Sequence, residues 1–116
     1  MQLSKIGGID IGSNSVRLLV SNVIQEENEL LFKKSSLVRL PIRLGADVFT
    51  KGAIGKRNVE RMIWAMESFD RIMRVNGVQA FRACATSAMR ESSNGAKVVE
   101  RIREATGIEI EIIDGV

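Results

Sequence analysis

Ile9-Asp10-Ile11-Gly12-Ser13-Asn14-Ser15-Val16-Arg17 is the stretch on which the fold of this chain depends. An apolar run over residues 6–11 carries one carboxylate, and a second apolar run covers residues 16–24. Between them stand a glycine and three small polar residues, which predicts two strands joined by a tight turn. Gly12 tolerates positive φ and the close approach of a ligand, and successive turn N–H groups form anion-binding concavities. The stretch therefore predicts a phosphate-handling hairpin, in which Asp10 suits a hydrated Mg²⁺ that accompanies phosphate. The alternative is an ordinary hairpin in which Asp10 is only a turn residue.

The composition is that of a soluble globular protein with a single core. The chain has 116 residues, of which 45% are hydrophobic and 27% charged, as in ordinary folded domains. No apolar run reaches the roughly 18 residues of a membrane span, and the N-terminus lacks the features of a signal peptide. The single Cys84 cannot form an internal disulfide, so a cytoplasmic location is expected. The net charge of +3 fits an anionic ligand, but an ordinary solvated surface explains it equally well.

The residue types that are missing restrict the chemistry. The sequence has no histidine and no tyrosine, which excludes a Ser-His or Cys-His nucleophile system within the chain. One cysteine without histidine also excludes a structural zinc site. Neither a Gly-x-Gly-x-x-Gly fingerprint nor a Gly-x-x-x-x-Gly-Lys-Ser/Thr loop occurs. Any catalysis must therefore rest on carboxylates, basic residues, a metal ion or the backbone.

The first half of the chain predicts three strands and a long helix. We expect strands over 5–11, 16–24 and about 30–44, with a polar turn at 25–29 and a loop at 45–50. Pro41 removes one backbone donor, which places the third strand at a sheet edge. Apolar residues at helical spacing predict a helix over about 51–76, with Thr50 as its cap and Asn76-Gly77 as its left-handed end.

The second half predicts a crossover architecture. We expect a strand over 78–85, a short helix over 86–91 and a strand over 108–113. Between them, residues 92–95 interrupt the first helix and cap another, which ends at Gly107. That helix is expected to turn four apolar residues inward: Val98, Val99, Ile102 and Ala105.

This order of elements defines a topology and a site. A meander of three strands followed by two helical crossovers gives a mixed sheet with spatial order 3-2-1-4-5, because crossovers connect parallel strands. The first and fourth strands are then central neighbours, and ligands bind at the carboxyl ends of strands where connections diverge. Residues 10–15 end the first strand and residues 86–90 follow the fourth. Both polar segments are therefore expected at one crevice.

The segment after the fourth strand has phosphate chemistry of its own. Thr86 and Ser87 start a helix, where free N–H groups favour anions. Arg90 lies about one turn further on, and a guanidinium can fork onto a phosphate. Arg17 projects from the second strand beside the hairpin. The alternatives are a plain N-cap for Thr86 and solvated surface arginines.

These motifs together resemble those of one family. Residues 9–18, IDIGSNSVRL, look like the opening signature of the exopolyphosphatase and guanosine pentaphosphate phosphohydrolase (Ppx/GppA) family. Residues 85–91, followed by Asn94-Gly95, are similar to its second signature, and residues 107–115 look like the run before its third. Residues 38–40 and 43–45 resemble its third strand. The resemblance implies an α/β actin-like (ribonuclease H-like) half-domain, in agreement with the predicted strand order.

The resemblance also implies roles for single residues. It implies that Asp10 holds Mg²⁺, or another divalent cation, directly or through its water shell. The other matched positions are expected to line the phosphate crevice: Gly12, Ser13, Asn14, Ser15, Arg17, Thr86, Ser87, Arg90 and Asn94. In the family a catalytic glutamate follows the turn at Asp114-Gly115, and a second phosphate loop comes later still. Because the sequence stops at Val116, residues 1–116 are expected to be the first part of the N-terminal domain, without the catalytic glutamate.

The expected function is therefore that of a longer protein. Its implied reaction is metal-assisted removal of a terminal phosphate from polyphosphate or guanosine pentaphosphate, by a cytoplasmic homodimer with neither DNA nor membrane as partner. The 116-residue chain alone is expected to be inactive. Two other functions stay open, because fold does not fix function. One is a non-catalytic phosphate-binding or regulatory module, and the other is an ATP-dependent kinase of the same fold group.

Overall fold

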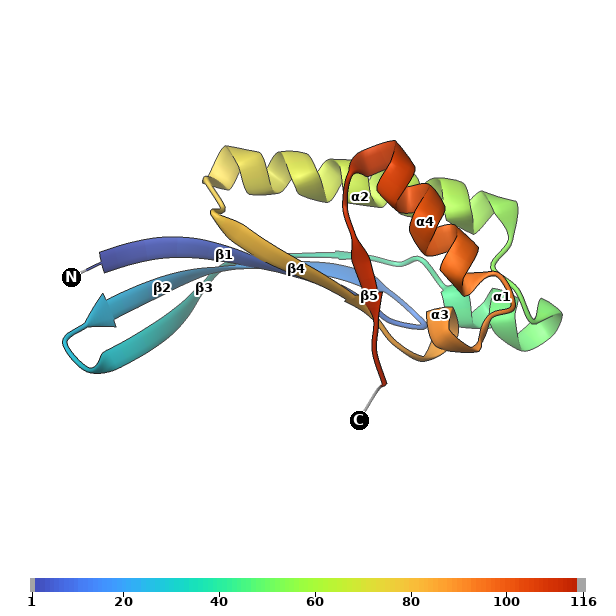
Figure 1. The fold of residues 1–116 in the computed structure, drawn as a ribbon, viewed down its shortest axis with the longest axis horizontal. Coiled ribbons are helices and arrows are strands. Elements are labelled where there is room, and N and C mark those ends of the chain that lie inside the picture. Colours follow the sequence, from blue (N-terminus) through green and yellow to red (C-terminus); the bar gives the residue numbers. More distant parts are fainter. Residues whose placement is uncertain (1, 115–116) are drawn as a thin grey trace.

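A computed structural model describes residues 2–114 as one mixed sheet with helices packed on it (Figure 1). The strands are β1 (Gln2–Ile11), β2 (Val16–Glu26), β3 (Glu29–Leu40), β4 (Ala80–Ala85) and β5 (Ile110–Ile112). The helices are α1 (Leu44–Lys51), α2 (Lys56–Asn76), α3 (Ser87–Glu91) and α4 (Gly95–Thr106). No helix among the described residues is long and apolar enough to cross a membrane.

The sheet confirms the predicted topology. Its strand order is β3-β2-β1-β4-β5. The short turns make β1–β2 and β2–β3 antiparallel, whereas the helical crossovers make β1–β4 and β4–β5 parallel. The first and fourth strands are therefore central neighbours, and the two polar segments lie at the same edge of the sheet.

One face of the sheet carries the hydrophobic core. Ile9 and Ile11 of β1 are buried on this face, under α2 and α4, because strand side chains alternate between faces. The apolar residues that predicted the helix over about 51–76 pack against them from α2, with Met66 and Phe69 fully buried. The opposite surface, which we call the open face, presents Asp10 and its neighbours on β2 and β4. Among residues 2–114, neither α2 nor α4 covers it (Figure 1).

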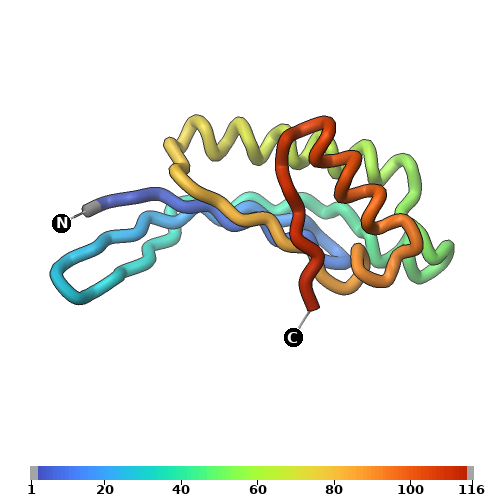
Figure 2. The backbone as a smooth tube through the Cα atoms, in the orientation of Figure 1, coloured from blue at the N-terminus to red at the C-terminus, as the bar shows by residue number. Residues whose placement is uncertain are grey.

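The molecule is elongated, because the meander extends beyond the helices. Its principal extents are 51 × 28 × 21 Å. Figure 2 shows the hairpin of β2 and β3 projecting past the start of β4. Several large apolar side chains on these strands are exposed, including Phe32 at 66% and Leu37 at 51%.

The connection between β3 and α2 differs from the prediction. The third strand ends at Leu40 rather than residue 44, and the whole of the predicted loop over 45–50 lies within helix α1. The Thr50 hydroxyl donates to the Ala46 carbonyl oxygen inside α1 and caps nothing. Gly52 has φ 72° and ends α1, so α2 begins at Lys56 instead of residue 51.

The ends of the later elements are largely as predicted. Gly77 (φ 71°) and Gly107 (φ 78°) end α2 and α4 in the left-handed conformation. The strands β4 and β5 are shorter than expected. Ala105 was expected to face inward and is exposed, whereas Val98 and Ile102 of the same helix are buried. The inward stripe of α4 is therefore narrower than the apolar pattern indicates.

Candidate functional site

The turn between β1 and β2 is closed by its own backbone and held by α1. The Gly12 N–H donates to the Ser15 carbonyl oxygen at 3.0 Å, which closes the turn. The Ser13 carbonyl oxygen accepts the N–H of Gly45 at 2.8 Å. A Cβ atom on Gly45 would lie 3.0 Å from the Ser13 Cβ and 3.2 Å from the Ser13 oxygen. The start of α1 therefore abuts the turn, and a glycine at this position permits the contact.

Gly45 is a supporting residue that analysis of the sequence did not single out. The apolar residues Leu44 and Val48, one turn apart, are buried and half-buried and mark the inner face of α1. Their spacing is the signal of a short amphipathic helix. It was masked by the alternating apolar pattern that extends the predicted third strand to residue 44.

The end of β4 is fastened directly to the end of β1. The Thr86 N–H donates to the Ile11 carbonyl oxygen at 3.2 Å, immediately before the hairpin turn. The Thr86 carbonyl oxygen then accepts the N–H of Arg90 at 3.0 Å, which forms the turn of α3. This hydrogen bond between Thr86 and Ile11 therefore joins the two polar segments that the sequence predicts to lie together.

Asp10 and Arg17 form an ion pair across the hairpin. They are direct partners in the antiparallel register, and Arg17 Nη2 lies 2.5 Å from Asp10 Oδ2. Each side chain is about half exposed, 49% for Asp10 and 51% for Arg17. Because even-numbered residues of β1 point to the open face, this pair lies on the side of the sheet away from the core.

A second ion pair lies on the same face. Arg82 Nη2 is 2.7 Å from Glu111 Oε2, joining β4 to β5. The hydrogen bond from Arg82 to this carboxylate raises the pKa of the guanidinium, and the negative charge of Glu111 adds to the effect. The open face near the crevice therefore carries paired charges around the exposed ends of the central strands.

Asp10 carries a carboxylate, whose oxygens are ligands of the kind that Mg²⁺ uses. Mg²⁺ is usually held by one or two carboxylates, several waters and the substrate phosphates. Among residues 2–114, no cluster of three Asp, Glu, Cys or His side chains could hold a metal by itself. The role of Asp10 toward Mg²⁺ therefore stays a prediction, and Arg17 contacts one of its carboxylate oxygens.

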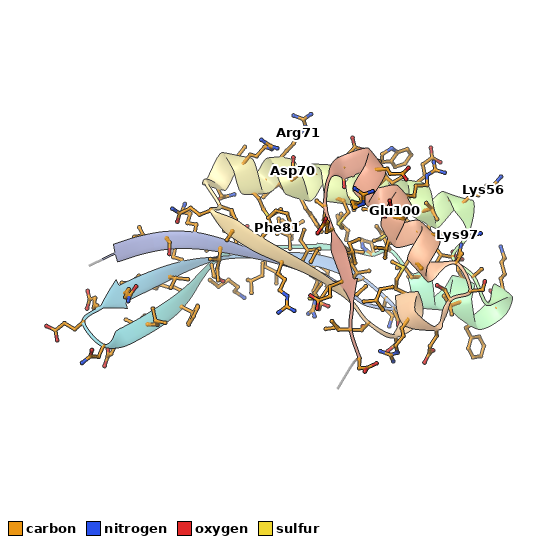
Figure 3. All side chains as sticks on the ribbon, viewed as in Figure 1. Lys56, Asp70, Arg71, Phe81, Lys97 and Glu100 are labelled. Atoms are coloured by element: carbon orange, nitrogen blue, oxygen red, sulfur yellow. The ribbon has the colours of Figure 1, made fainter. Side chains whose placement is uncertain are left out.

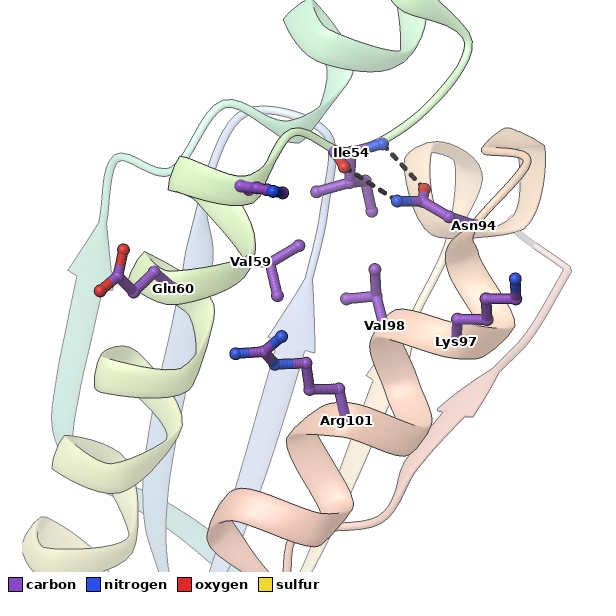
Figure 4. Close-up of a pocket in the computed structure, with 8 residues that line it drawn as sticks. Ile54, Val59, Glu60, Asn94, Lys97, Val98 and Arg101 are labelled. Carbon is purple, nitrogen blue, oxygen red and sulfur yellow. Dashed lines mark hydrogen bonds between the residues drawn. The ribbon is translucent and has the colours of Figure 1, made fainter.

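Two of the predicted phosphate residues make structural contacts. Arg90 Nη1 donates to the Ile113 carbonyl oxygen at 2.9 Å and lies 3.9 Å from Asp114 Oδ1. The amide of Asn94 accepts the N–H of Ile54 and donates to the Ile54 carbonyl oxygen, both at 2.9 Å (Figure 4). Arg90 therefore reaches toward the end of β5, and Asn94 ties α4 to the segment before α2. Their roles toward phosphate stay predictions.

The other predicted residues stay close to the crevice. Asn14 is exposed at the tip of the turn, and Ser13 and Ser15 are half-buried. Ser87 begins α3, directly after Thr86. Backbone donors, hydroxyl groups, arginines and one carboxylate are thus gathered where the connections of β1 and β4 diverge. In open sheets of this kind, ligands bind at the carboxyl ends of the strands where the connections diverge.

The family follows from the sequence comparison. The sequence model described as the Ppx/GppA phosphatase family matches residues 23–116. This match covers most of the chain, and the chain belongs to that family. A relative named exopolyphosphatase 1, from Mycobacterium tuberculosis, is 31% identical over 111 residues. That alignment covers 96% of this chain but 31% of the relative, so the chain spans about a third of the relative's length.

Solved structures show the same fold. A Ppx/GppA family member from Aquifex aeolicus superposes with a TM-score of 0.86 at 25% identity, over 97% of this chain and 36% of that one. The ethanolamine utilization protein EutJ from Carboxydothermus hydrogenoformans superposes with a TM-score of 0.51 at 14% identity, over 98% of this chain and 37% of that one. The second likeness concerns the fold alone. The predicted actin-like architecture and the predicted family are both confirmed.

Proposed function

We propose that this chain is the N-terminal part of a phosphohydrolase that removes the terminal phosphate of inorganic polyphosphate or guanosine pentaphosphate. The observation that carries the proposal is the hydrogen bond from the Thr86 N–H to the Ile11 carbonyl oxygen, which joins the start of α3 to the segment before the hairpin turn. Membership of a family that includes exopolyphosphatases supports the hydrolytic reaction. The choice between the two substrates belongs to the proposal.

Each residue of the crevice has its own role in this proposed binding of phosphate. The turn of residues 12–15, which Gly12 closes, offers the phosphate oxygens the backbone N–H groups of residues 13–15 and the hydroxyl groups of Ser13 and Ser15. Arg17 and Arg90 neutralise their charge, and Thr86 and Ser87 add donors from the other side. Positioning and charge neutralisation supply most of the catalysis of phosphoryl transfer. Asp10 holds the divalent cation, which neutralises the phosphate chain when bound.

The chain alone is proposed to be inactive. The family resemblance places the carboxylate that activates water after the turn at Asp114-Gly115, and the assistance of such a group is worth roughly 10²–10⁴-fold. We also propose that the longer protein is a cytoplasmic homodimer. Incubating the 116-residue chain with polyphosphate and Mg²⁺ should release no phosphate. Sustained release that disappears in Asp10→Asn would show a complete site within this chain.

The main test is Asp10→Asn in the longer protein. We expect turnover of polyphosphate to fall about 100-fold or more, as when a single charge-stabilising group is removed. Circular dichroism and the melting temperature should stay unchanged, because Asp10 is half exposed. The matched control is Asp70→Asn, which also removes a carboxylate but from an ion pair with Arg74 on α2. Near-normal turnover of Asp10→Asn at saturating Mg²⁺ would remove Asp10 from the site.

A further inference from the structure

The last strand of the described sheet is short and lies at its edge. β5 has three residues, Ile110–Ile112, and among residues 2–114 it pairs with β4 alone. An edge strand of this length has few backbone hydrogen bonds, so its end is expected to open more readily than the centre of the sheet. Because β1, β4 and β5 run parallel, the end of β5 lies at the same edge of the sheet as the crevice. Contacts that hold this end therefore affect the geometry of the crevice.

Ile113, directly after β5, is held through both of its backbone polar groups. Its N–H donates to the Ala85 carbonyl oxygen at 2.8 Å, which continues the pairing with β4. Its carbonyl oxygen accepts a hydrogen bond of 2.9 Å from Arg90 Nη1. The chain that leaves β5 is therefore fastened both to the end of β4 and to a side chain of α3.

The guanidinium of Arg90 holds the backbone rather than the neighbouring carboxylate. Asp114 Oδ1 lies 3.9 Å from Arg90 Nη1, and the Asp114 side chain is 99% exposed. An ion pair with so exposed a partner contributes little, whereas a hydrogen bond from a charged donor is one of the stronger kinds. The Arg90 side chain is 35% exposed, the lowest value among the arginines of the five ion pairs found in residues 2–114. It is therefore more enclosed than those solvated arginines.

The backbone of Arg90 is tied to the two central strands. Its N–H donates to the Thr86 carbonyl oxygen at 3.0 Å, and the Thr86 N–H donates to the Ile11 carbonyl oxygen at 3.2 Å. Together with the bond to Ile113, these contacts form a continuous path from the end of β1 to the end of β5. Figure 1 shows α3 directly after β4, at this edge of the sheet. The short helix therefore sets the position of the last strand relative to the first.

We propose that Arg90 is a positioning residue, which fixes the path of the chain as it leaves β5 at the crevice. The inference rests on the proposed function, in which the carboxylate that activates water follows residues 114–115. Arg90 acts on that group through the Ile113 carbonyl oxygen, in addition to the contact with phosphate that the proposed function gives it. A displacement near 1 Å can cost roughly 100-fold in rate. The hold on Ile113 therefore affects turnover as well as local stability.

Amide hydrogen exchange of the 116-residue chain tests this hold without any substrate. Arg90→Met keeps an unbranched side chain and removes every donor. We expect the Ile113 N–H to exchange about tenfold faster, because the lost bond has a charged donor, while the N–H of Leu18, a buried residue of β2, keeps its rate. Arg90→Lys retains one donor group and should give an intermediate rate. The matched control is Arg74→Met, which breaks an ion pair with Asp70. Figure 3 shows Asp70 in the helix layer, away from the end of β5.

Kinetics of the longer protein then separate positioning from phosphate binding. We expect kcat for polyphosphate to fall about tenfold or more in Arg90→Met and to recover in part in Arg90→Lys. Arg74→Met should change kcat less than about twofold, because it removes only an exposed ion pair.

Two results would overturn the inference. One is an unchanged exchange rate of Ile113 in Arg90→Met. The other is an unchanged kcat with a raised KM, which would leave Arg90 as a phosphate contact and the proposed function standing. Near-normal turnover of Asp10→Asn would instead remove the proposed function, while faster exchange of Ile113 would still assign the hold on β5 to Arg90.

Discussion

At the scale of single residues, the site is defined by which charges are paired. Asp10 and Arg17 stand opposite each other in the hairpin and are already in contact without a ligand. The sequence predicted both residues, because a carboxylate inside an apolar strand and an arginine just past a small-residue turn are recognisable locally. It could not predict that they pair, since this depends on the register of the two strands. Nor could it predict that Asn94 bonds to Ile54, which lies 40 positions away.

Gly45 tests how the hairpin turn is supported. We predict that Gly45→Ala in the longer protein lowers kcat/KM for polyphosphate by up to about tenfold, because the close contact displaces the turn by a few tenths of an ångström, less than the 1 Å that can cost roughly 100-fold. The new methyl group would stand 3.0 Å from the Ser13 Cβ and push the turn out of place. The neighbouring exposed residue gives the control, Ala46→Ser, which should have little effect. Unchanged kcat/KM in Gly45→Ala would mean that the turn adjusts without loss.

At the scale of elements, the helices end where glycine permits the left-handed conformation. Asn76-Gly77 and Gly107 were predictable because a helix end with positive φ strongly favours glycine. The helix α1 was not, since its eight residues follow an alternating apolar pattern that continues the strand before it. Gly52 and Gly55 lie inside the helix predicted over about 51–76, and in the structure they separate α1 from α2. The two glycines are compatible either with one long helix or with two separate helices. The packing of Leu44 into the core decides for two helices.

Gly77, at the end of α2, allows the cost of the left-handed conformation to be measured. We predict that Gly77→Ala destabilises the chain by about 1–2 kcal/mol, the cost of the left-handed conformation for a residue with a Cβ atom. No atom lies within 4 Å of the added methyl group, so the cost is conformational alone. Gly8→Ala is the matched control, because its Cβ also meets nothing within 4 Å and its φ is not positive. Chemical denaturation of both variants should show loss of stability in the first alone.

At the scale of the whole molecule, the open face is the main departure from an ordinary small domain. The strand order and the edge position of β3 could be predicted, because short turns and helical crossovers restrict topology strongly. The sequence could not show how much of the sheet stays uncovered. On this face Leu19, Phe32 and Leu37 are all more than a third exposed. Exposed apolar patches of this kind commonly mark surfaces that associate.

We predict that the 116-residue chain self-associates through this face as its concentration rises. Analytical ultracentrifugation should show a concentration-dependent increase in average mass. Phe32→Ser/Leu37→Ser should shift the distribution toward the monomer, because it removes the apolar area that association would bury. The control is Phe49→Ser, which removes a side chain that is 92% exposed but lies on α1. A monomer at all concentrations, or an equal effect of the control, would contradict the prediction.

The pairing of β1 with β4 has a consequence for the order in which the protein is built. On the ribosome, β1, β2 and β3 emerge first and can pair at once, because their contacts are local. The crevice cannot form then, since its other wall begins at Thr86 and follows the whole of α2. Contacts between distant parts of a chain form slowly. During synthesis the hairpin turn is therefore exposed before its partner exists, and a nascent chain stalled before residue 86 should lack the phosphate crevice altogether.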